Sequence, residues 1–253
     1  MEKNKIVLIV PFYNCKEFLE GCVASILSQD YDNIRAVFIG DASSDGSSEA
    51  LDQIKDDPRF VFIRNEQNLT ALPNIHKAVM EFTEPNDIVA LLDGDDRLLK
   101  TNSLSTLAKI YEDQDCWVSW SLAKWSDNSH PGIGSAYPTE REYKSQRQLP
   151  LRYSHLRSWR AALYTKRFAE QDPSFSGLKD KNNEFYRVTY DVAIFANLLN
   201  LTPYSKAYFA PVYLYWYNRG NPISDDKVRQ KYQTDVHMEI SRKPDLKQVD
   251  SYL

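Results

Sequence analysis

A run of five apolar residues, 88–92, leads directly into three carboxylates within four positions, Asp93, Asp95 and Asp96, with Gly94 after the first of them. An unbroken apolar run of this length predicts a buried strand, and the glycine lets the chain turn tightly at its end. Crowded carboxylates raise one another's pKa. A divalent cation removes that cost, and oxygen ligands suit Mg²⁺ or Mn²⁺, which share their shells with phosphates. The alternative is a solvated acidic turn.

Strand-like and helix-like segments alternate through the first hundred residues. Continuous apolar runs predict strands over 6–10, 34–39, 60–63 and 88–92. Apolar residues at helical spacing predict helices over 18–27 and 72–82. Asn14 is expected to cap the first helix, and Ser47 or Ser48 the short helix after the second strand. This alternation is typical of right-handed βαβ units, so we predict an α/β fold with a mostly parallel sheet flanked by helices.

Polar or turn-forming residues follow each of the predicted strands. These residues are Pro11, Tyr13 and Asn14, then Gly40 and Asp41, then Arg64 and Asn65, and finally the acidic turn at 93–96. Ligands of parallel sheets bind at the carboxyl ends of the strands, so the pattern predicts a nucleotide site with a metal at its rim. The sequence contains no GxGxxG and no GxxxxGK[ST], which argues against dinucleotide oxidoreductases and P-loop NTPases.

The second half of the chain is less regular. The patterns predict helices over 104–111, 160–168 and 184–199, and strands over 116–120 and 208–217 with Pro211 at an edge or bulge. Residues 125–150 are rich in Pro, Gly, Ser and charged side chains, so a mobile loop over the site or a partly disordered insertion is expected there. From residue 225 onward a helix that then frays is expected.

Charge and cysteine usage exclude several classes of function. The net charge is −4 with both signs well mixed, so no footprint for nucleic acid is present. The three cysteines are odd in number and lack metal spacing, which fits a reducing compartment. The apolar run at 6–10 is too short for a signal peptide or a membrane span, so a cytoplasmic protein without a membrane span is expected.

Three segments resemble the successive signatures of family 2 glycosyltransferases of the GT-A fold. They are IVLIVPFYN at 6–14, GDASSDGS at 40–47 and DGDD at 93–96, and their order and spacing match as well as their residue types. The resemblance is strong over about the first 100 residues. It implies one Rossmann-like GT-A domain with a nucleotide-sugar-binding half (1–98), an acceptor-binding half (99–228) and a C-terminal helical tail (229–253).

The resemblance also implies a UDP-sugar donor and a Mn²⁺ or Mg²⁺ ion. Pro11, Tyr13 and Asn14 would lie at the nucleoside, and Asp41 would accept a hydrogen bond from uracil N3–H. Among the metal-site residues, Asp95 would bind the ion directly, Asp96 would support it, and Asp93 with Gly94 would approach the ribose or a metal-bound water. Gly40 stands where the family usually has another Asp.

Phosphate contacts are harder to assign from this resemblance. Asn68 lies in the segment where the family carries an Asn-rich stretch with a phosphate-binding Arg, as do Asn65 and Asn74, but that Arg is absent. Arg64 and Arg157 are the replacement candidates. For each Asn the alternative is a turn or cap residue, and this is the role we expect for Asn65.

A second motif, HLRSWR at 155–160, resembles a subset of the family. It would present a cation and an imidazole to the diphosphate or the acceptor. The alternative is an ordinary helix start with Arg157 in a surface ion pair. Trp159 is either a sugar-stacking or a core residue. Residues 217–225 resemble the family's closing loop, or form a simple turn.

Family 2 enzymes invert the anomeric centre, so a carboxylate must deprotonate the acceptor. The segment 184–191 fits the family's location for this base, and Asp191 is our choice because a lone Asp in an apolar helix needs a partner or a purpose. An ion pair with Arg187 is the alternative role, and Glu184 and Asp180 are the alternative bases.

The function predicted from the sequence is the metal-dependent, inverting transfer of a hexose, glucose or a relative, from a UDP-sugar. The acceptor would be a hydroxyl on a glycan or protein, hydroxylysine of a collagen-like protein included, bound by loops at 125–150 and 204–226. A non-catalytic nucleotide-sugar-binding module and a sugar-1-phosphate nucleotidyltransferase are the alternatives. The latter expects a Gly-rich loop and a Lys after the first strand, which are absent. Homodimerisation stays open.

Overall fold

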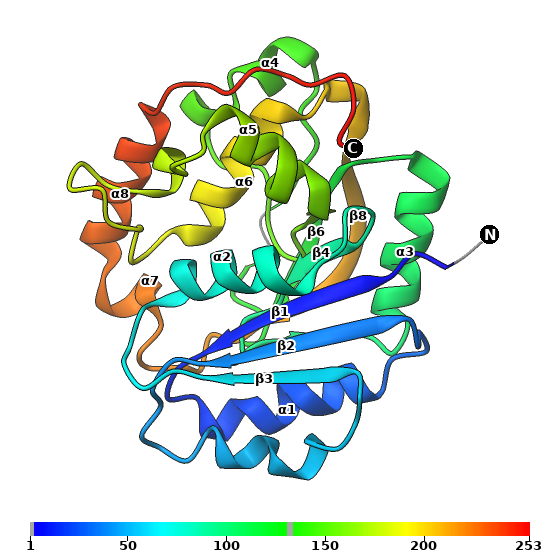
Figure 1. The fold of residues 1–253 in the computed structure, drawn as a ribbon, viewed down its shortest axis with the longest axis vertical. Coiled ribbons are helices and arrows are strands. Elements are labelled where there is room, and N and C mark those ends of the chain that lie inside the picture. Colours follow the sequence, from blue (N-terminus) through cyan, green and yellow to red (C-terminus); the bar gives the residue numbers. More distant parts are fainter. Residues whose placement is uncertain (1–2, 131–133) are drawn as a thin grey trace.

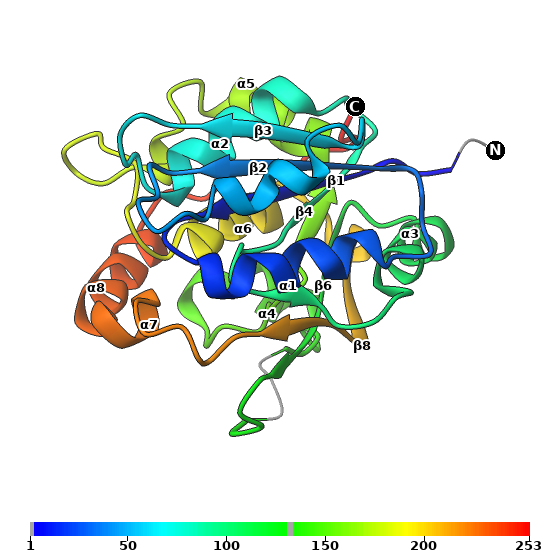
Figure 2. The ribbon, with the colours of Figure 1, turned by 90° about the horizontal axis from the view of Figure 1, so that it is seen from below.

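An eight-stranded sheet with helices on both faces forms the centre of the molecule (Figure 1, Figure 2). The computed structural model describes residues 3–130 and 134–253. The strand order is β3-β2-β1-β4-β7-β6-β8-β5. The strands are β1 (Ile6–Phe12), β2 (Ile34–Gly40), β3 (Phe60–Arg64), β4 (Ile88–Leu91), β5 (Arg97–Leu98), β6 (Val118–Trp125), β7 (Ser158–Arg160) and β8 (Ala207–Tyr217).

The helices fall into two layers. The α-helices are α1 (Lys16–Leu27), α2 (Ala71–Phe82), α3 (Ser103–Gln114), α4 (Glu140–Lys144), α5 (Ala169–Gln171), α6 (Tyr190–Leu201), α7 (Asp225–Val228) and α8 (Gln230–Ser241). Short 3-10 helices are η1 (Glu49–Ile54), η2 (Gln146–Gln148), η4 (Ser176–Leu178) and η5 (Tyr204–Lys206), and η3 (Leu163–Phe168) is a π-helix. The two core clusters give the sides: α1 and α3 pack with the cluster on one face of the sheet, and α2, α5 and α6 pack with the cluster on the other.

The first four predicted strands form the parallel part of the sheet, as the sequence predicts. β1 pairs in parallel with β2 and β4, and β2 with β3. Alternate residues of β1 face opposite layers: Ile6 and Leu8 pack with the α1 and α3 cluster, whereas Val7 and Ile9 pack with the α2 and α6 cluster. Burial on both faces explains the continuous apolar run. The carboxyl ends of these strands therefore meet at one edge.

The second half extends the same sheet with mixed strand directions. β7 is antiparallel to β4 and β6, and β8 is parallel to β6. The register between β6 and β8 shifts between the Trp120–Phe209 and Leu122–Tyr213 pairs. Pro211 lies within this irregularity, as predicted for a proline in a strand.

Two helix predictions are wrong at their starts. Residues 158–160 form β7, so the helical segment begins only after Arg160, and Trp159 is fully buried in the core instead of facing a sugar. The predicted helix over 184–199 begins only at Tyr190. Before it the chain is extended, and Phe185 forms a bridge with Lys179. Phe185 and Val188 still pack with the core, so their apolar spacing matches a helical period although the segment is not helical.

The later part of the segment 125–150 packs against the core instead of covering the site, whereas residues 127–130 are exposed and residues 131–133 lie outside the described residues. It contains α4 and η2, and Tyr143 is buried with its hydroxyl donating to the carbonyls of Leu199 (2.8 Å) and Thr202 (2.9 Å). The C-terminal tail is helical only to Ser241. Beyond it, Leu246, Val249 and Tyr252 pack against the core, so the expected fraying is wrong too.

The predicted caps are not formed. Cys15 is the N-cap of α1 and gives no side-chain cap, and neither does Ser48 at η1. Asn14 instead has φ +44° and joins the neighbouring loop: its backbone N–H donates to Ser43 Oγ (3.1 Å), and its side-chain oxygen accepts from the Ser44 N–H (2.9 Å).

Across the described ranges, every helix is too short or too polar to cross a lipid bilayer.

Candidate active site

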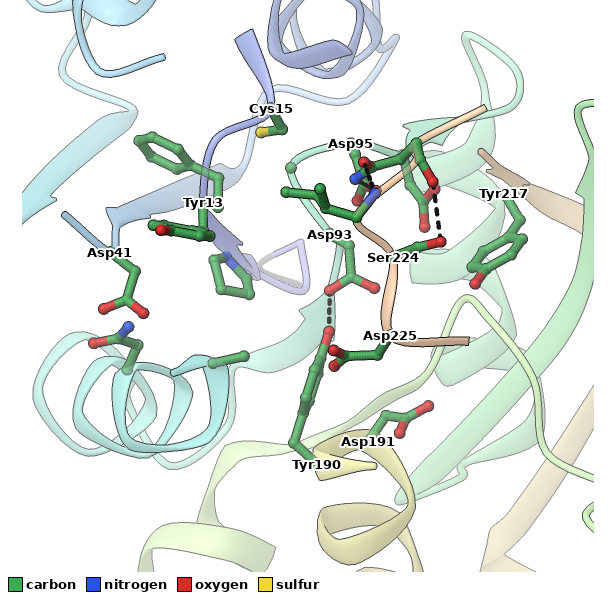
Figure 3. A pocket seen from close by; sticks show the side chains of 18 of the residues that line it. Tyr13, Cys15, Asp41, Asp93, Asp95, Tyr190, Asp191, Tyr217, Ser224 and Asp225 are labelled. Atoms are coloured by element: carbon green, nitrogen blue, oxygen red, sulfur yellow. Dashed lines mark hydrogen bonds between the residues drawn. The ribbon is translucent and has the colours of Figure 1, made fainter. Parts of the chain in front are cut away.

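A cavity of ≈ 270 Å³ lies at the carboxyl ends of β1, β2 and β4 (Figure 3). It runs from Tyr13 and Asp41 at one end, past Asp93, to Asp191 and Tyr217 at the other. The residues that line it are Pro11, Phe12, Tyr13, Cys15, Asp41, Ala71, Asn74, Asp93, Gly94, Asp95, Asp96, His155, Thr189, Tyr190, Asp191, Tyr217, Asn221, Ile223, Ser224, Asp225 and Gln233. The parallel half and the second half of the chain thus both contribute walls.

At one end, Asp41 is held rigidly below the exposed ring of Tyr13. Its carboxylate accepts hydrogen bonds from the backbone N–H groups of Leu69 (2.9 Å) and Thr70 (2.8 Å) and from Asn65 Nδ2 (2.9 Å). Asn65 therefore links Asp41 to the start of α2 instead of capping a turn. Asn68 donates to the Asp41 carbonyl (3.2 Å) but does not line the cavity.

The three carboxylates of the acidic turn have different partners. Asp93 accepts a hydrogen bond from the Tyr190 hydroxyl, and Asp95 accepts one from Asn221 Nδ2 at 2.7 Å. Both oxygens of the buried Asp96 are used, by the Tyr215 hydroxyl (2.6 Å) and the Asn218 N–H (2.7 Å). Asp96 therefore fastens the turn to β8, while Asp93 and Asp95 face the cavity.

Gly94 is required at this turn. A Cβ atom there would lie 2.5 Å from Phe12 Cβ and 3.2 Å from the Pro11 carbonyl oxygen. Its own N–H donates to that carbonyl at 3.1 Å. The backbone of the acidic turn therefore lies directly against β1, which a side chain at this position would prevent.

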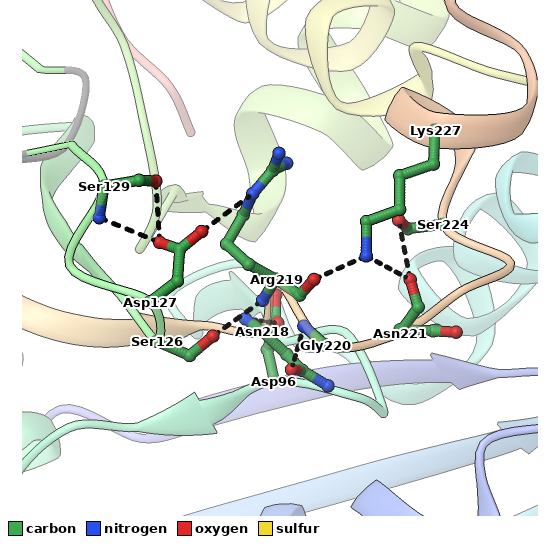
Figure 4. A network of polar contacts seen from close by, with 10 residues as sticks. All are labelled: Asp96, Ser126, Asp127, Ser129, Asn218, Arg219, Gly220, Asn221, Ser224 and Lys227. Atoms are coloured by element: carbon green, nitrogen blue, oxygen red, sulfur yellow. Dashed lines mark hydrogen bonds and ion pairs between the residues drawn. The ribbon is translucent and has the colours of Figure 1, made fainter.

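The loop after β8 is tied to the same turn (Figure 4). The Asn218 N–H holds Asp96, and the Asn221 carbonyl accepts hydrogen bonds from Lys227 Nζ (2.8 Å) and Ser224 Oγ (3.1 Å). These contacts place the start of α7 at the cavity. The resemblance of residues 217–225 to a closing loop thus agrees with their position beside the site.

The electrostatics of the cavity favour a cation. Burial and the Asp95 carboxylate raise the pKa of Asp93 to about 7, and burial raises the pKa of Asp96 well above its usual range. Six of the lining residues are aspartates, and none of the described residues in that lining is Lys or Arg. Crowded carboxylates with raised pKa values gain stability from a positive ligand.

The donor set fits a hard divalent ion that keeps open positions. The described residues contain no group of three or more His, Cys, Asp or Glu side chains close enough to hold a metal. Asp96 is buried and both of its oxygens already accept hydrogen bonds, so Asp93 and Asp95 are the candidate ligands at the cavity. Mg²⁺ in nucleotide sites is held by one or two carboxylates and completed by phosphate oxygens and water, which matches this pair.

Asp191 lies in the first turn of α6 and not in the middle of a helix. Its Oδ2 is 2.8 Å from Arg157 Nη2, so its ion pair is with Arg157 and not with Arg187. Although burial raises it, the pKa of Asp191 is lowered overall, chiefly by this guanidinium. The alternative bases Glu184 and Asp180 are not among the lining residues.

Comparison with known families decides the identity of the fold. The family model described as "Glycosyl transferase family 2" matches residues 7–172. The chain belongs to this family. Its GT-A fold is that of S. aureus TarS 1–349 in complex with UDP-GlcNAc, with a TM-score of 0.66, 15% identity, and coverage of 93% of this chain and 65% of the TarS 1–349 chain.

One further solved structure and one relative by sequence also match this chain. The mannosyltransferase PcManGT from Pyrobaculum calidifontis, in complex with GDP-Man and Mn²⁺, has a TM-score of 0.57, 16% identity, and coverage of 86% of this chain and 57% of PcManGT. The Campylobacter jejuni GalNAc(5)-diNAcBac-PP-undecaprenol beta-1,3-glucosyltransferase is 35% identical over 104 residues, which is 41% of this chain and 33% of that protein. The chain therefore spans a third of this relative.

Three residues that the family resemblance placed at the donor do not line the cavity. Asn14 does not line the cavity, and neither Arg64 nor Arg157 is positioned there as a phosphate ligand. Arg64 pairs with Asp52 at 3.1 Å, and Arg157 is buried behind Asp191. Both predicted phosphate contacts thus lack support in the geometry.

Sequence reasoning missed other lining residues of this family 2 site. Tyr190, Asn221 and Gln233 line the cavity, and the first two hold the acidic turn. Tyr190 directly precedes Asp191, so a search around the base for groups that reach a strand end would have found it. Asn221 lies in the segment 217–225 that resembles the family's closing loop, although no role was predicted for the residue itself, and Gln233 carries no such signal.

Proposed function

We propose that this protein transfers a hexose from a UDP-sugar to an acceptor hydroxyl with inversion, using Mn²⁺ or Mg²⁺. The observation that carries the proposal is the cavity at the carboxyl ends of the parallel strands, which has six aspartates and no Lys or Arg among its described lining residues. A diphosphate cannot bind there without a cation to offset the like charges. Family membership makes a nucleotide-sugar the diphosphate ligand.

The donor would lie along the cavity with its base at Tyr13 and Asp41. The ring of Tyr13 is 45% exposed and free to pack on a base beside Pro11. The Asp41 carboxylate is held by Asn65 and two backbone N–H groups, and its Oδ2, which accepts a hydrogen bond from Thr70, has a second lone pair that can accept the uracil N3–H. UDP is supported by the TarS complex with UDP-GlcNAc, and glucose by two relatives whose names describe them as glucosyltransferases.

Asp93 and Asp95 would hold the divalent ion, with Asp96 as a structural neighbour instead of a ligand. When bound, the ion supplies charge neutralisation for the diphosphate and for the leaving UDP. Tyr190 orients Asp93 and Asn221 orients Asp95 through the hydrogen bonds described above. The complex of PcManGT with Mn²⁺ supports Mn²⁺ as the ion.

Asp191 would act as the general base. Its lowered pKa keeps the carboxylate ionised at neutral pH, so it can accept the proton of the acceptor hydroxyl as the oxygen attacks the anomeric carbon. The electron pair of the broken bond leaves with UDP. The acceptor is a hydroxyl on a glycan or a protein, hydroxylysine included.

The test compares turnover and binding in the variant Asp191→Asn. We expect UDP release in the presence of acceptors to fall by 10²- to 10⁴-fold, the usual contribution of a general base, while Mn²⁺-dependent UDP binding stays within two-fold of wild type. Glu184→Gln and Asp180→Asn are matched controls, because both carboxylates lie outside the cavity lining, and both should keep wild-type turnover.

Full turnover by Asp191→Asn would overturn the assignment of the base. A non-catalytic nucleotide-sugar-binding module is the second candidate function, favoured if wild type binds UDP with metal but never releases UDP from any UDP-sugar with a panel of glycan, lipid-linked and hydroxylysine acceptors.

A further inference from the structure

His155 is an aromatic residue of the cavity that the proposed chemistry does not yet use. It lies three residues before β7 and lines the cavity. Its imidazole packs parallel to the rings of Tyr215 (centroids 4.7 Å apart, 23°) and Tyr217 (5.5 Å, 9°), both on β8. Contacts with two aromatic rings fix the plane of the imidazole.

The backbone at His155 is also fixed. The Ser121 hydroxyl of β6 donates a hydrogen bond to the His155 carbonyl at 3.1 Å. Ser121 Oγ in turn accepts a hydrogen bond from the Leu156 N–H at 2.9 Å. In contrast, the ring nitrogens of His155 have no hydrogen bond to any residue that the structure describes. His155 is half-buried, so a ring held this firmly, with its nitrogens unbonded at a cavity, is placed to meet a ligand.

The imidazole is linked to both chemical groups of the proposed reaction. Tyr215, on which it packs, contacts the acidic turn through Asp96 (2.6 Å) and the Asp93 N–H (3.2 Å). Asp191 lines the same cavity and interacts electrostatically with the imidazole. In a direct displacement, the transferred sugar must lie between the metal-held diphosphate and the base, and His155 is a residue of the cavity with links to both.

The charge state of the ring suits a hydroxyl. Burial and the neighbouring Arg157 lower the pKa of His155 to about 3, so the imidazole is neutral at physiological pH. A neutral imidazole donates from one nitrogen and accepts at the other. A sugar hydroxyl both donates and accepts, whereas a phosphate would favour a cationic partner.

We propose that His155 hydrogen-bonds a hydroxyl of the transferred sugar and is thereby a specificity-determining residue for the donor. The inference rests on the proposed function and adds to it the protein group that recognises the sugar. The contact would discriminate between hexoses that differ in the orientation of one hydroxyl, because the wrong epimer leaves a polar atom without its partner.

The experiment compares the affinities of UDP and of UDP-glucose, with Mn²⁺ present, for wild type and His155→Phe by calorimetry. The phenyl ring keeps the packing on both tyrosines and removes the nitrogens. We expect the ratio of the UDP-glucose Kd to the UDP Kd to rise about 5- to 10-fold, the effect of one lost hydrogen bond, with UDP binding within two-fold of wild type. His155→Gln, which keeps a donor and an acceptor, should restore part of the ratio.

His130→Phe is the matched control, because that imidazole also packs on an aromatic ring, Trp125 (5.2 Å), but does not line the cavity. It should leave both affinities unchanged. Equal losses for UDP and UDP-glucose in His155→Phe would indicate a phosphate contact and overturn the inference. So would an unchanged ratio in both His155 variants. If wild type itself binds neither ligand with Mn²⁺, the proposed function fails first.

Discussion

The carboxylates of the acidic turn are one or two residues apart, yet each contacts a different partner. Asp93 contacts Tyr190, Asp95 contacts Asn221, and Asp96 is enclosed by β8. The side chains of three neighbouring aspartates thus divide into two that face the cavity and one that fastens the turn. A carboxylate whose oxygens are already used is a poor metal ligand, which is why we exclude Asp96.

The raised pKa of Asp93 makes the stability of the metal-free protein depend on pH. The folded state holds the proton up to about pH 7, whereas an unfolded Asp loses it near its ordinary pKa of 3.8. The stabilisation is therefore fully present below pH 3.8 and is lost as the pH rises through 7. We expect the free energy of unfolding, measured in EDTA, to decline by ~2 kcal/mol more in wild type than in Asp93→Asn over this range.

Parallel pH profiles of wild type and Asp93→Asn would contradict this account. Added Mn²⁺ should remove most of the decline in wild type, because the ion replaces the proton between the carboxylates.

Tyr190 is expected to matter for metal binding. Tyr190→Phe removes the hydrogen bond that orients Asp93, and loss of such an outer partner typically weakens metal affinity by about 10-fold or more. Mn²⁺ affinity is measured by electron paramagnetic resonance of the free ion. Tyr232→Phe, on an exposed ring of α8, is the control, and identical Mn²⁺ affinities in the two variants would rule out the orienting role.

The positions of Asp41, Asp93 and Asp95 at one sheet edge follow from the order of strands and apolar runs, so the sequence was sufficient to predict them. The partners of these side chains were not predictable in this way. Tyr190 lies 97 residues from Asp93, and Asn221 lies 126 residues from Asp95. No local sequence pattern predicts which distant side chain will contact the end of a strand in the folded protein.

At the scale of secondary structure, long apolar elements were predictable and short or extended ones were not. β7 has three residues, which is too few for a period to be recognised. α6 begins six residues later than predicted because Thr189 has φ +59°, a left-handed conformation that a helix does not continue through. The late start places Asp191 in the first turn of the helix, at the cavity.

The elements of the second half are joined by Arg147. This buried guanidinium donates to Asn200 Oδ1 (2.7 Å), Asn197 Oδ1 (2.7 Å) and the Ile240 carbonyl (3.0 Å), and it pairs with Asp245 at 3.1 Å. It therefore connects η2, α6, α8 and the C-terminal segment. None of these groups lines the candidate active site.

Arg147→Ala should destabilise the fold by ~3 kcal/mol, because it leaves several buried polar groups without their partner. Urea denaturation measures the change. Arg141→Ala, on the exposed face of α4, is the control and should shift the free energy of unfolding by less than ~0.5 kcal/mol. Similar shifts for both variants would mean that the buried network contributes little.

At the scale of the whole molecule, one sheet carries both halves of the candidate site. The parallel strands supply Asp41, Asp93 and Asp95, and the mixed strands and α6 supply His155 and Asp191. The end formed by Asp41, Asp93 and Asp95 was predictable because βαβ units bring strand ends together. The end formed by His155 and Asp191 depends on packing within the second half of the chain, where the composition of residues 125–150 had indicated a mobile loop over the site or a partly disordered insertion.

The central claim is that a cavity lined by six aspartates binds a nucleotide-sugar only together with a divalent ion. The most direct measurement is a calorimetric titration of UDP-glucose into the wild-type protein, once with Mn²⁺ and once with EDTA. The account predicts binding at one site per chain with Mn²⁺ and no measurable binding in EDTA. Equal affinity under both conditions, or no binding of UDP or UDP-glucose with Mn²⁺, would contradict it.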